Sequence, residues 1–257
     1  MGLPAVVSTG RSRFGANTTI GEIGRELAAN LRVLILGGIP VGVFVGGVLG
    51  RLAMLVLRLT SPDRVRGVES DDGFTIGEFT LGGTYNLLMV GAAVGLIGAG
   101  LYRLVAQWLI GPTWFRRVTV GLACAAVVGA ILVHDDGIDF HLLKPTWLAI
   151  GLFVAVPGLF GVLIGPAVDR VVRDDEHSPH AKQRWLFAVG LVAIFPLSLF
   201  VLALLTPVVW FVTVLRRTGM LERLRTSTLA GLAVRGVLLL VAVAGLVALI
   251  RDIGDIV

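Results

Sequence analysis

The sequence predicts an all-α fold: a polytopic bundle of about six transmembrane helices with a small extracytoplasmic β-hairpin between the first two spans. Three observations lead to this class. The chain is only 15% charged, whereas soluble domains carry roughly 25% charged residues. It is 56% hydrophobic, with a mean hydropathy of +0.90. Its apolar segments are each long enough to cross a bilayer at about 20 residues per span.

The N-terminal region is expected to be a polar tail followed by a short amphipathic helix. Thr19 followed by Glu22 is a capping-box pattern that opens a helix through about Arg32. Residues 1–32 are therefore assigned to a cytoplasmic tail and amphipathic helix, and 33–257 to a single transmembrane domain. The spans are expected near residues 33–57, 83–106, 118–134, 146–169, 185–215 and 229–250.

Positive charge between the spans predicts the orientation, because cytoplasmic loops of membrane proteins are enriched in Lys and Arg. One side holds most of these residues: Arg11, Arg13, Arg25, Arg32, Arg103, Arg116, Arg117, Arg170, Arg173, Lys182 and Arg184. The other side holds fewer: Arg51, Arg58, Arg64, Arg66 and Lys144. The N-terminus is therefore predicted to be cytoplasmic, in a multi-pass protein of a bacterial plasma membrane.

The fifth segment conflicts with this pattern. It is long and contains Pro196 and Pro207, which remove backbone donors and kink or break helices. A simple crossing would place Arg216, Arg217, Arg223 and Arg225 outside. Either one long kinked helix crosses once, or a broken, re-entrant pair returns the basic loop to the cytoplasm. The single kinked crossing is preferred because each half is short for a full span.

Residues 65–80 are expected to form the extracytoplasmic hairpin. Val65–Ser70 and Phe74–Thr80 flank Asp71-Asp72-Gly73, and Asp-Gly is a favoured hairpin turn.

A stripe of glycines indicates close helix packing in the first span. Small residues let helix backbones approach closely in lipid, where no hydrophobic force drives helices together. The candidate packing positions, a glycine zipper with its counterparts on the second span, are Gly38, Gly42, Gly46, Gly50, Gly91 and Gly95. The stripe is interpreted first as a seam inside the bundle and second as an oligomer contact.

The densest polar cluster follows the third span. It consists of His134, Asp135, Asp136, Asp139 and His141. Imidazole and carboxylate groups at this spacing are able to hold a divalent metal or relay protons. A solvated acidic loop explains the same residues, and no His-Glu-x-x-His pattern is present.

Two arginines are candidate intramembrane charges. Arg51 follows the last glycine of the stripe, where its side chain is able to extend to the interface or to pair with a carboxylate. Arg235 lies seven residues inside the last span, again close enough to the interface for such an extension.

The expected function is that of a non-enzymatic structural or accessory component of the inner membrane. No nucleotide-binding loop, dinucleotide fingerprint, paired-cysteine motif or serine-nucleophile motif occurs, so an enzyme is disfavoured and no cofactor is expected. The expected partners are the lipid bilayer and either a second copy or another membrane protein. Nucleic acid is not expected, because the arginines lie at the ends of apolar segments.

Two alternative functions remain open. A small transporter or channel would have a polar path near Arg51, Asn86, Asp135 and Arg235. A membrane-embedded, metal-dependent enzyme would use His134, Asp139 and His141.

Overall fold

The structure is a computed structural model that describes residues 20–62, 80–133, 144–177, 181–219, 223 and 226–256. In this part of the chain every regular element is helical, which confirms the all-α class. The predicted β-hairpin lies outside the described residues except for Thr80. Thr80 is the N-cap of the next helix, and its hydroxyl accepts a hydrogen bond from the Gly83 amide at 3.1 Å.

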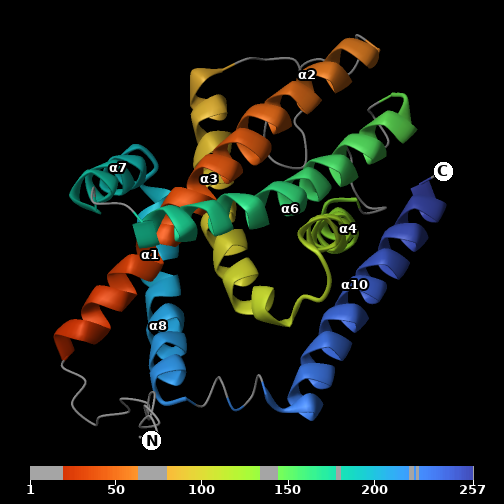
Figure 1. Ribbon diagram of the computed structural model, residues 1–257. Coiled ribbons are helices and arrows are strands. Elements are labelled where there is room, and N and C mark those ends of the chain that lie inside the picture. Colours follow the sequence, from red (N-terminus) through yellow and green to blue (C-terminus); the bar gives the residue numbers. More distant parts are fainter. Residues whose placement is uncertain are drawn as a thin grey trace, which may run out of the picture.

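The helices follow one another along the chain as Figure 1 shows. They are α1 (Ile20–Gly42), η1 (Val43–Leu49), α2 (Gly50–Thr60), α3 (Leu81–Val105), η3 (Ala106–Trp108), α4 (Thr113–Leu132), α6 (Thr146–His177), α7 (Ala181–Ile194), α8 (Leu197–Arg217) and α10 (Thr228–Ile256).

Six helical runs are long and apolar enough to cross a membrane, in agreement with the predicted bundle of about six spans. They are Gly21–Thr60, Leu81–Trp108, Thr113–Leu132, Thr146–Asp174, Leu197–Arg217 and Thr228–Ile256. The first run is 40 residues long, or about 60 Å at 1.5 Å per residue. It exceeds the roughly 30 Å hydrocarbon thickness of a bilayer.

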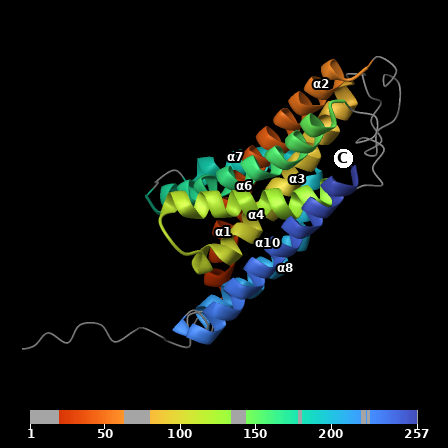
Figure 2. The same ribbon diagram turned by 90° about the vertical axis from the view of Figure 1, so that its right-hand side faces the viewer.

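Two groups of helices make up the bundle, and α6 contacts both. The larger apolar core lies between α1, α3, α7 and α8 and includes Ile39 and Leu96, both fully buried. The second core joins α2, α4, α6 and α10 around Val133 and Ala149. Figure 1 shows α10 at one edge, apart from α8, and Figure 2 shows α4 and α6 lying along one another.

The backbones of α1 and α3 touch where glycines face each other. A Cβ atom placed on Gly42 would lie 2.7 Å from the Cα and 2.8 Å from the N of Gly95, and closer still to the Gly91 carbonyl oxygen. A Cβ atom on Gly91 would lie 2.6 Å from the Gly42 oxygen, and one on Gly38 would collide with the Gly95 carbonyl. We call this contact of Gly38 and Gly42 with Gly91 and Gly95 the α1–α3 seam.

The π-helix η1 changes the register of the glycine stripe after Gly42. A π-helix holds one residue more than the α-helix that it replaces. The residues after it are therefore rotated relative to the register that an uninterrupted α-helix of the same sequence would have. The nearest atom to a Cβ on Gly50 is therefore a Leu87 methyl at 3.6 Å, an ordinary contact, while a Cβ on Gly46 would lie 3.2 Å from the Gly91 Cα. Gly47, which is not in the stripe, lies close to α3: its Cβ would be 3.2 Å from the Leu88 Cα.

A second glycine contact joins α4 and α6. A Cβ atom on Gly161 would lie 2.7 Å from the Val120 carbonyl oxygen and 2.9 Å from the Cys124 Sγ. A Cβ on Gly121 would lie 3.1 Å from the Gly158 oxygen. Small residues thus bring these two helices together as well.

The segment 185–215 is two helices, not one. The Ile194 carbonyl at the end of α7 accepts a hydrogen bond of 2.6 Å from the Tyr85 hydroxyl, near the start of α3. At the other end of α8, Arg217 pairs with Glu26 near the start of α1. The chain therefore reverses direction at residues 195–196. The preference for a single kinked crossing is wrong, and the broken pair is the observed arrangement.

Local and tertiary factors together explain this reversal. Pro196 has no amide hydrogen with which to continue the α7 helix. α7 has 14 residues, or about 21 Å, which is too short to cross a bilayer alone. Phe195 and Ser198 on either side of Pro196 are buried, whereas Ile194, Pro196 and Leu197 are exposed, so protein covers one side of the irregular backbone.

We call one end of the bundle the basic end. It combines the first half of α1, the end of α3, the start of α4, the end of α6, the start of α7, the end of α8 and the start of α10. It carries Arg25, Arg32, Arg103, Arg116, Arg117, Arg170, Arg173, Arg184, Arg216, Arg217, Arg223 and Arg235. The C-terminal end of α10 lies at the opposite end, where Leu249 packs with Val133.

Candidate functional site

The main polar site of the described chain lies at the basic end, between α3, α4 and α6. Tyr102, one turn before the end of α3, is only 7% exposed. Its hydroxyl donates a hydrogen bond to the Asp169 carboxylate on α6 at 2.9 Å. The ring also lies against Gly165, where an added Cβ would be 2.9 Å from a ring carbon. Gly165 therefore makes room for the tyrosine that positions Asp169.

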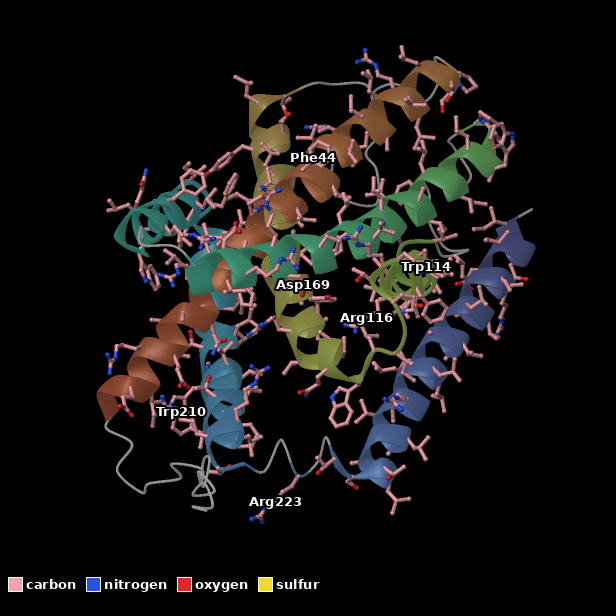
Figure 3. All side chains as sticks on the ribbon, viewed as in Figure 1. Phe44, Trp114, Arg116, Asp169, Trp210 and Arg223 are labelled. Carbon is pink, nitrogen blue, oxygen red and sulfur yellow. The ribbon has the colours of Figure 1, made fainter. Side chains whose placement is uncertain are left out.

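A pocket of about 100 Å³ opens beside this pair. Its polar lining consists of Tyr102, Thr113, Arg116, Arg117, Asp169 and Arg173, while Val120, Gly161, Gly165 and Pro166 line the rest. Arg116 is on the first turn of α4, and Asp169 lies across from it on α6 (Figure 3). The Arg116 Nε also donates to the Gly111 carbonyl at 3.0 Å, which fixes the connection between η3 and α4.

Asn30 of α1 links two further helices at this end. Its side-chain oxygen accepts a hydrogen bond from the Arg103 guanidinium of α3 at 3.1 Å. Its side-chain nitrogen donates to the Thr213 hydroxyl of α8 at 3.3 Å. Thr213 is 2% exposed and donates in turn to the Val209 carbonyl at 2.7 Å. One amide therefore joins α1, α3 and α8.

Two other arginines attach α7 and α8 to α1. Arg32, which is 8% exposed, lies with its guanidinium carbon 5.8 Å from the centre of the Trp185 ring on α7. Such cation–π contacts strengthen when they are desolvated. Arg217 of α8 lies 2.6 Å from a Glu26 oxygen and 3.6 Å from a Glu22 oxygen.

The structure does not bring Arg51, Asn86 and Arg235 together. Arg51 is the second residue of α2. The other end of α2 lies opposite the basic end, where Ser61 hydrogen-bonds to Lys144. Arg235 is at the basic end, where its Nε donates to the Trp108 carbonyl at 3.1 Å. Asn86 is exposed in the second turn of α3. These three side chains therefore do not line one shared path.

The candidate metal cluster of His134, Asp135, Asp136, Asp139 and His141 lies outside the described residues. Among the residues that the structure does describe, no group of three or more His, Cys, Asp or Glu side chains is placed to hold a metal.

Several of the residues that build the site were missed by sequence reasoning. For Asp169 the sequence does contain an indication of a site, because this acidic residue follows directly after an apolar run. Intramembrane carboxylates are uncommon and mark sites by default. Tyr102 and Asn30 gave no such signal, since each is one polar residue near the end of an apolar segment. Their importance depends on which helices are neighbours.

Comparison with family models, with curated proteins and with solved structures finds no match to this chain.

Proposed function

We propose that the protein is a non-enzymatic structural or accessory component of a membrane. The observation that supports this function best is that polar side chains within the bundle link one helix to another. Asn30 joins three helices, Arg217 connects α8 to α1, and Arg235 connects α10 to η3. These contacts act as links between helices and do not converge on one reacting point. Backbone contacts at the α1–α3 seam add to the same rigid framework.

The proposed location is a bacterial plasma membrane, with the N-terminus in the cytoplasm. The helix reversal at Pro196 supports this orientation, because it places Arg216, Arg217 and Arg223 on the same side as Arg25 and Arg103. The arginine-rich basic end then faces the cytoplasm as the positive-inside rule requires.

The experiment that tests the accessory function combines native mass spectrometry with a flux assay. The full chain is purified in a mild detergent, and the mass of the particle is compared with 27.2 kDa for one chain. We expect a stoichiometric assembly, either with a second copy or with another membrane protein, and no flux in liposomes. A particle of one chain that moves ions or solutes across liposomes would overturn the proposal.

A small transporter is the second candidate, and the helix reversal between α7 and α8 is the observation that favours it. Broken helices often form the substrate sites of transporters. The Ser198 hydroxyl, next to the break, is fully buried and has no hydrogen-bond partner in the described part of the chain. A transport path would therefore pass Ser198 and Tyr85, in place of one through Arg51 and Arg235. Flux that is lost in Ser198→Ala would support this candidate.

The metal-dependent enzyme remains the third candidate. Its residues, His134, Asp139 and His141, lie outside the described part of the chain, and no described contact favours it.

A further inference from the structure

The pocket between α3, α4 and α6 has more positive than negative charge. Three arginines line it, Arg116, Arg117 and Arg173, against the single carboxylate of Asp169. That carboxylate already accepts a hydrogen bond from Tyr102 in the wall of the pocket. The lining therefore carries a formal net charge of +2 and favours an anion.

The volume of the pocket limits the size of that anion. At about 100 Å³, it is much smaller than the roughly 300–1,000 Å³ of sites for drug-sized ligands. It suits one compact oxyanion, with any remaining part of the ligand outside the pocket. Guanidinium groups match the geometry of phosphate oxygens, to which they donate two parallel hydrogen bonds.

The position of the pocket corresponds to the membrane interface. It opens where α3 ends and α4 begins, so it lies at the ends of two candidate spans. Trp114, 65% exposed, is on the first turn of α4. Tryptophan is enriched at the level of the lipid headgroups. Basic pockets between transmembrane helices at this level bind anionic headgroups.

We propose that this pocket binds the phosphate group of an anionic ligand, with the headgroup of an anionic phospholipid as its source in the membrane. Arg117 and Arg173 bind the phosphate oxygens from α4 and α6. Thr113 adds a hydroxyl donor. The Tyr102–Asp169 pair forms the wall of the pocket, and its carboxylate weakens the binding of anions. This inference does not depend on the accessory function, because both a scaffold and a transporter can hold a lipid.

The test measures binding to the full chain in an uncharged maltoside detergent, which contains no phosphate. Native mass spectrometry and thermal shift are recorded with phosphatidylglycerol, with inorganic phosphate and with zwitterionic phosphatidylcholine. Arg117→Gln and Arg173→Gln are the pocket variants, since Arg116 also fixes the chain at Gly111. Arg170→Gln is the matched control, because it is exposed on the same helix, loses the same charge and does not line the pocket.

The expected result is binding of phosphatidylglycerol that falls about fivefold in each pocket variant, from about 1 kcal/mol per arginine near a lipid surface. Arg170→Gln should retain the wild-type affinity. Asp169→Asn should bind severalfold more tightly, because it removes a negative charge while its amide oxygen still accepts from Tyr102. A variant that is merely misfolded would not bind more tightly.

The three ligands distinguish the source of the phosphate. Saturable binding of phosphatidylglycerol alone identifies a lipid site. Binding of inorganic phosphate with the same dependence on Arg117 and Arg173 also supports the pocket, but identifies a soluble phosphate as its ligand. The proposal is overturned by binding of neither anion, by equal losses in Arg170→Gln and the pocket variants, or by equal affinity for phosphatidylcholine.

Discussion

Gly42 illustrates how a single position determines the distance between two helices. Its Cα faces the backbone of Gly91 and Gly95, so a methyl group there has no room on either side. The contact atoms are backbone atoms, which cannot rotate away as a flexible side chain does. Any larger residue at Gly42 must therefore separate α1 from α3.

We predict that Gly42→Ala destabilises the protein. Alanine favours a helix over glycine by about 1 kcal/mol, yet the added methyl group should cost on the order of 1–3 kcal/mol through overpacking. The melting temperature of the purified protein in detergent should therefore fall. Gly236→Ala is the matched control, because Gly236 is also inside a helix and no atom lies within 4 Å of its added Cβ. If both variants melt like the wild type, the α1–α3 seam has no energetic importance.

At the scale of elements, the π-helix η1 lets one long helical run satisfy two different contacts. Before η1, Gly38 and Gly42 face α3. After η1, Leu57 packs with Val133 and Ala149 of the second core and is 2% exposed. η1 takes up one extra residue between the two contacts, so that Leu57 and the rest of α2 keep the positions of a continuous α-helix that is one residue shorter. Phe44 is 51% exposed within η1 (Figure 3), so its side chain adds little to either core.

Deletion of Phe44 tests this role of η1. Removing one residue from a π-helix restores α-helical spacing, so α2 should keep its direction, and the melting temperature and helical circular dichroism should stay near the wild type. Deletion of Leu55, an exposed residue in the regular helix α2, should rotate the remainder of α2 by about 100°. It would expose Leu57, at a cost of about 2 kcal/mol or more. Equal damage from the two deletions would contradict this account of η1.

At the scale of the whole molecule, the reversal between α7 and α8 decides on which side the C-terminus lies. A single crossing would have placed the loop around Arg223 opposite the N-terminus. In the structure, Arg217 contacts Glu22 and Glu26, so the end of α8 lies beside the start of α1. α10 then runs to the opposite end, where Leu249 joins Val133.

Cysteine labelling tests this topology. In a background with Cys124→Ala, which removes the one natural cysteine, an impermeant maleimide is applied to intact cells. Lys144→Cys should react from outside, and Arg223→Cys only after the membrane is permeabilised. Labelling of both positions from one side would contradict the reversal. If instead Arg223→Cys reacts from outside and Lys144→Cys reacts only after permeabilisation, the result contradicts the proposed cytoplasmic N-terminus.

The glycine stripe and the fifth segment show how far sequence reasoning reaches. The spacing of Gly38 and Gly42 indicated close packing, and the structure places a helix backbone against both. The same spacing predicted an equally close backbone contact at Gly50, but after η1 this glycine faces a leucine methyl instead. A π-helix depends on the packing of the flanking turns, so a four-residue repeat does not reveal it. Pro196 showed where the fifth segment breaks, but not that the chain turns back there.

The sequence alone determined the helical class, the approximate number of spans and the concentration of arginine at span ends. Each depends on how a local stretch of side chains partitions between water and lipid. Only the tertiary structure decided the partners: Tyr102 with Asp169, which are 67 residues apart, and Asn30 with Thr213, which are 183 apart. Inside lipid, hydrophobicity does not select one helix neighbour over another. Shape and hydrogen bonding make that choice, and they depend on the two surfaces together.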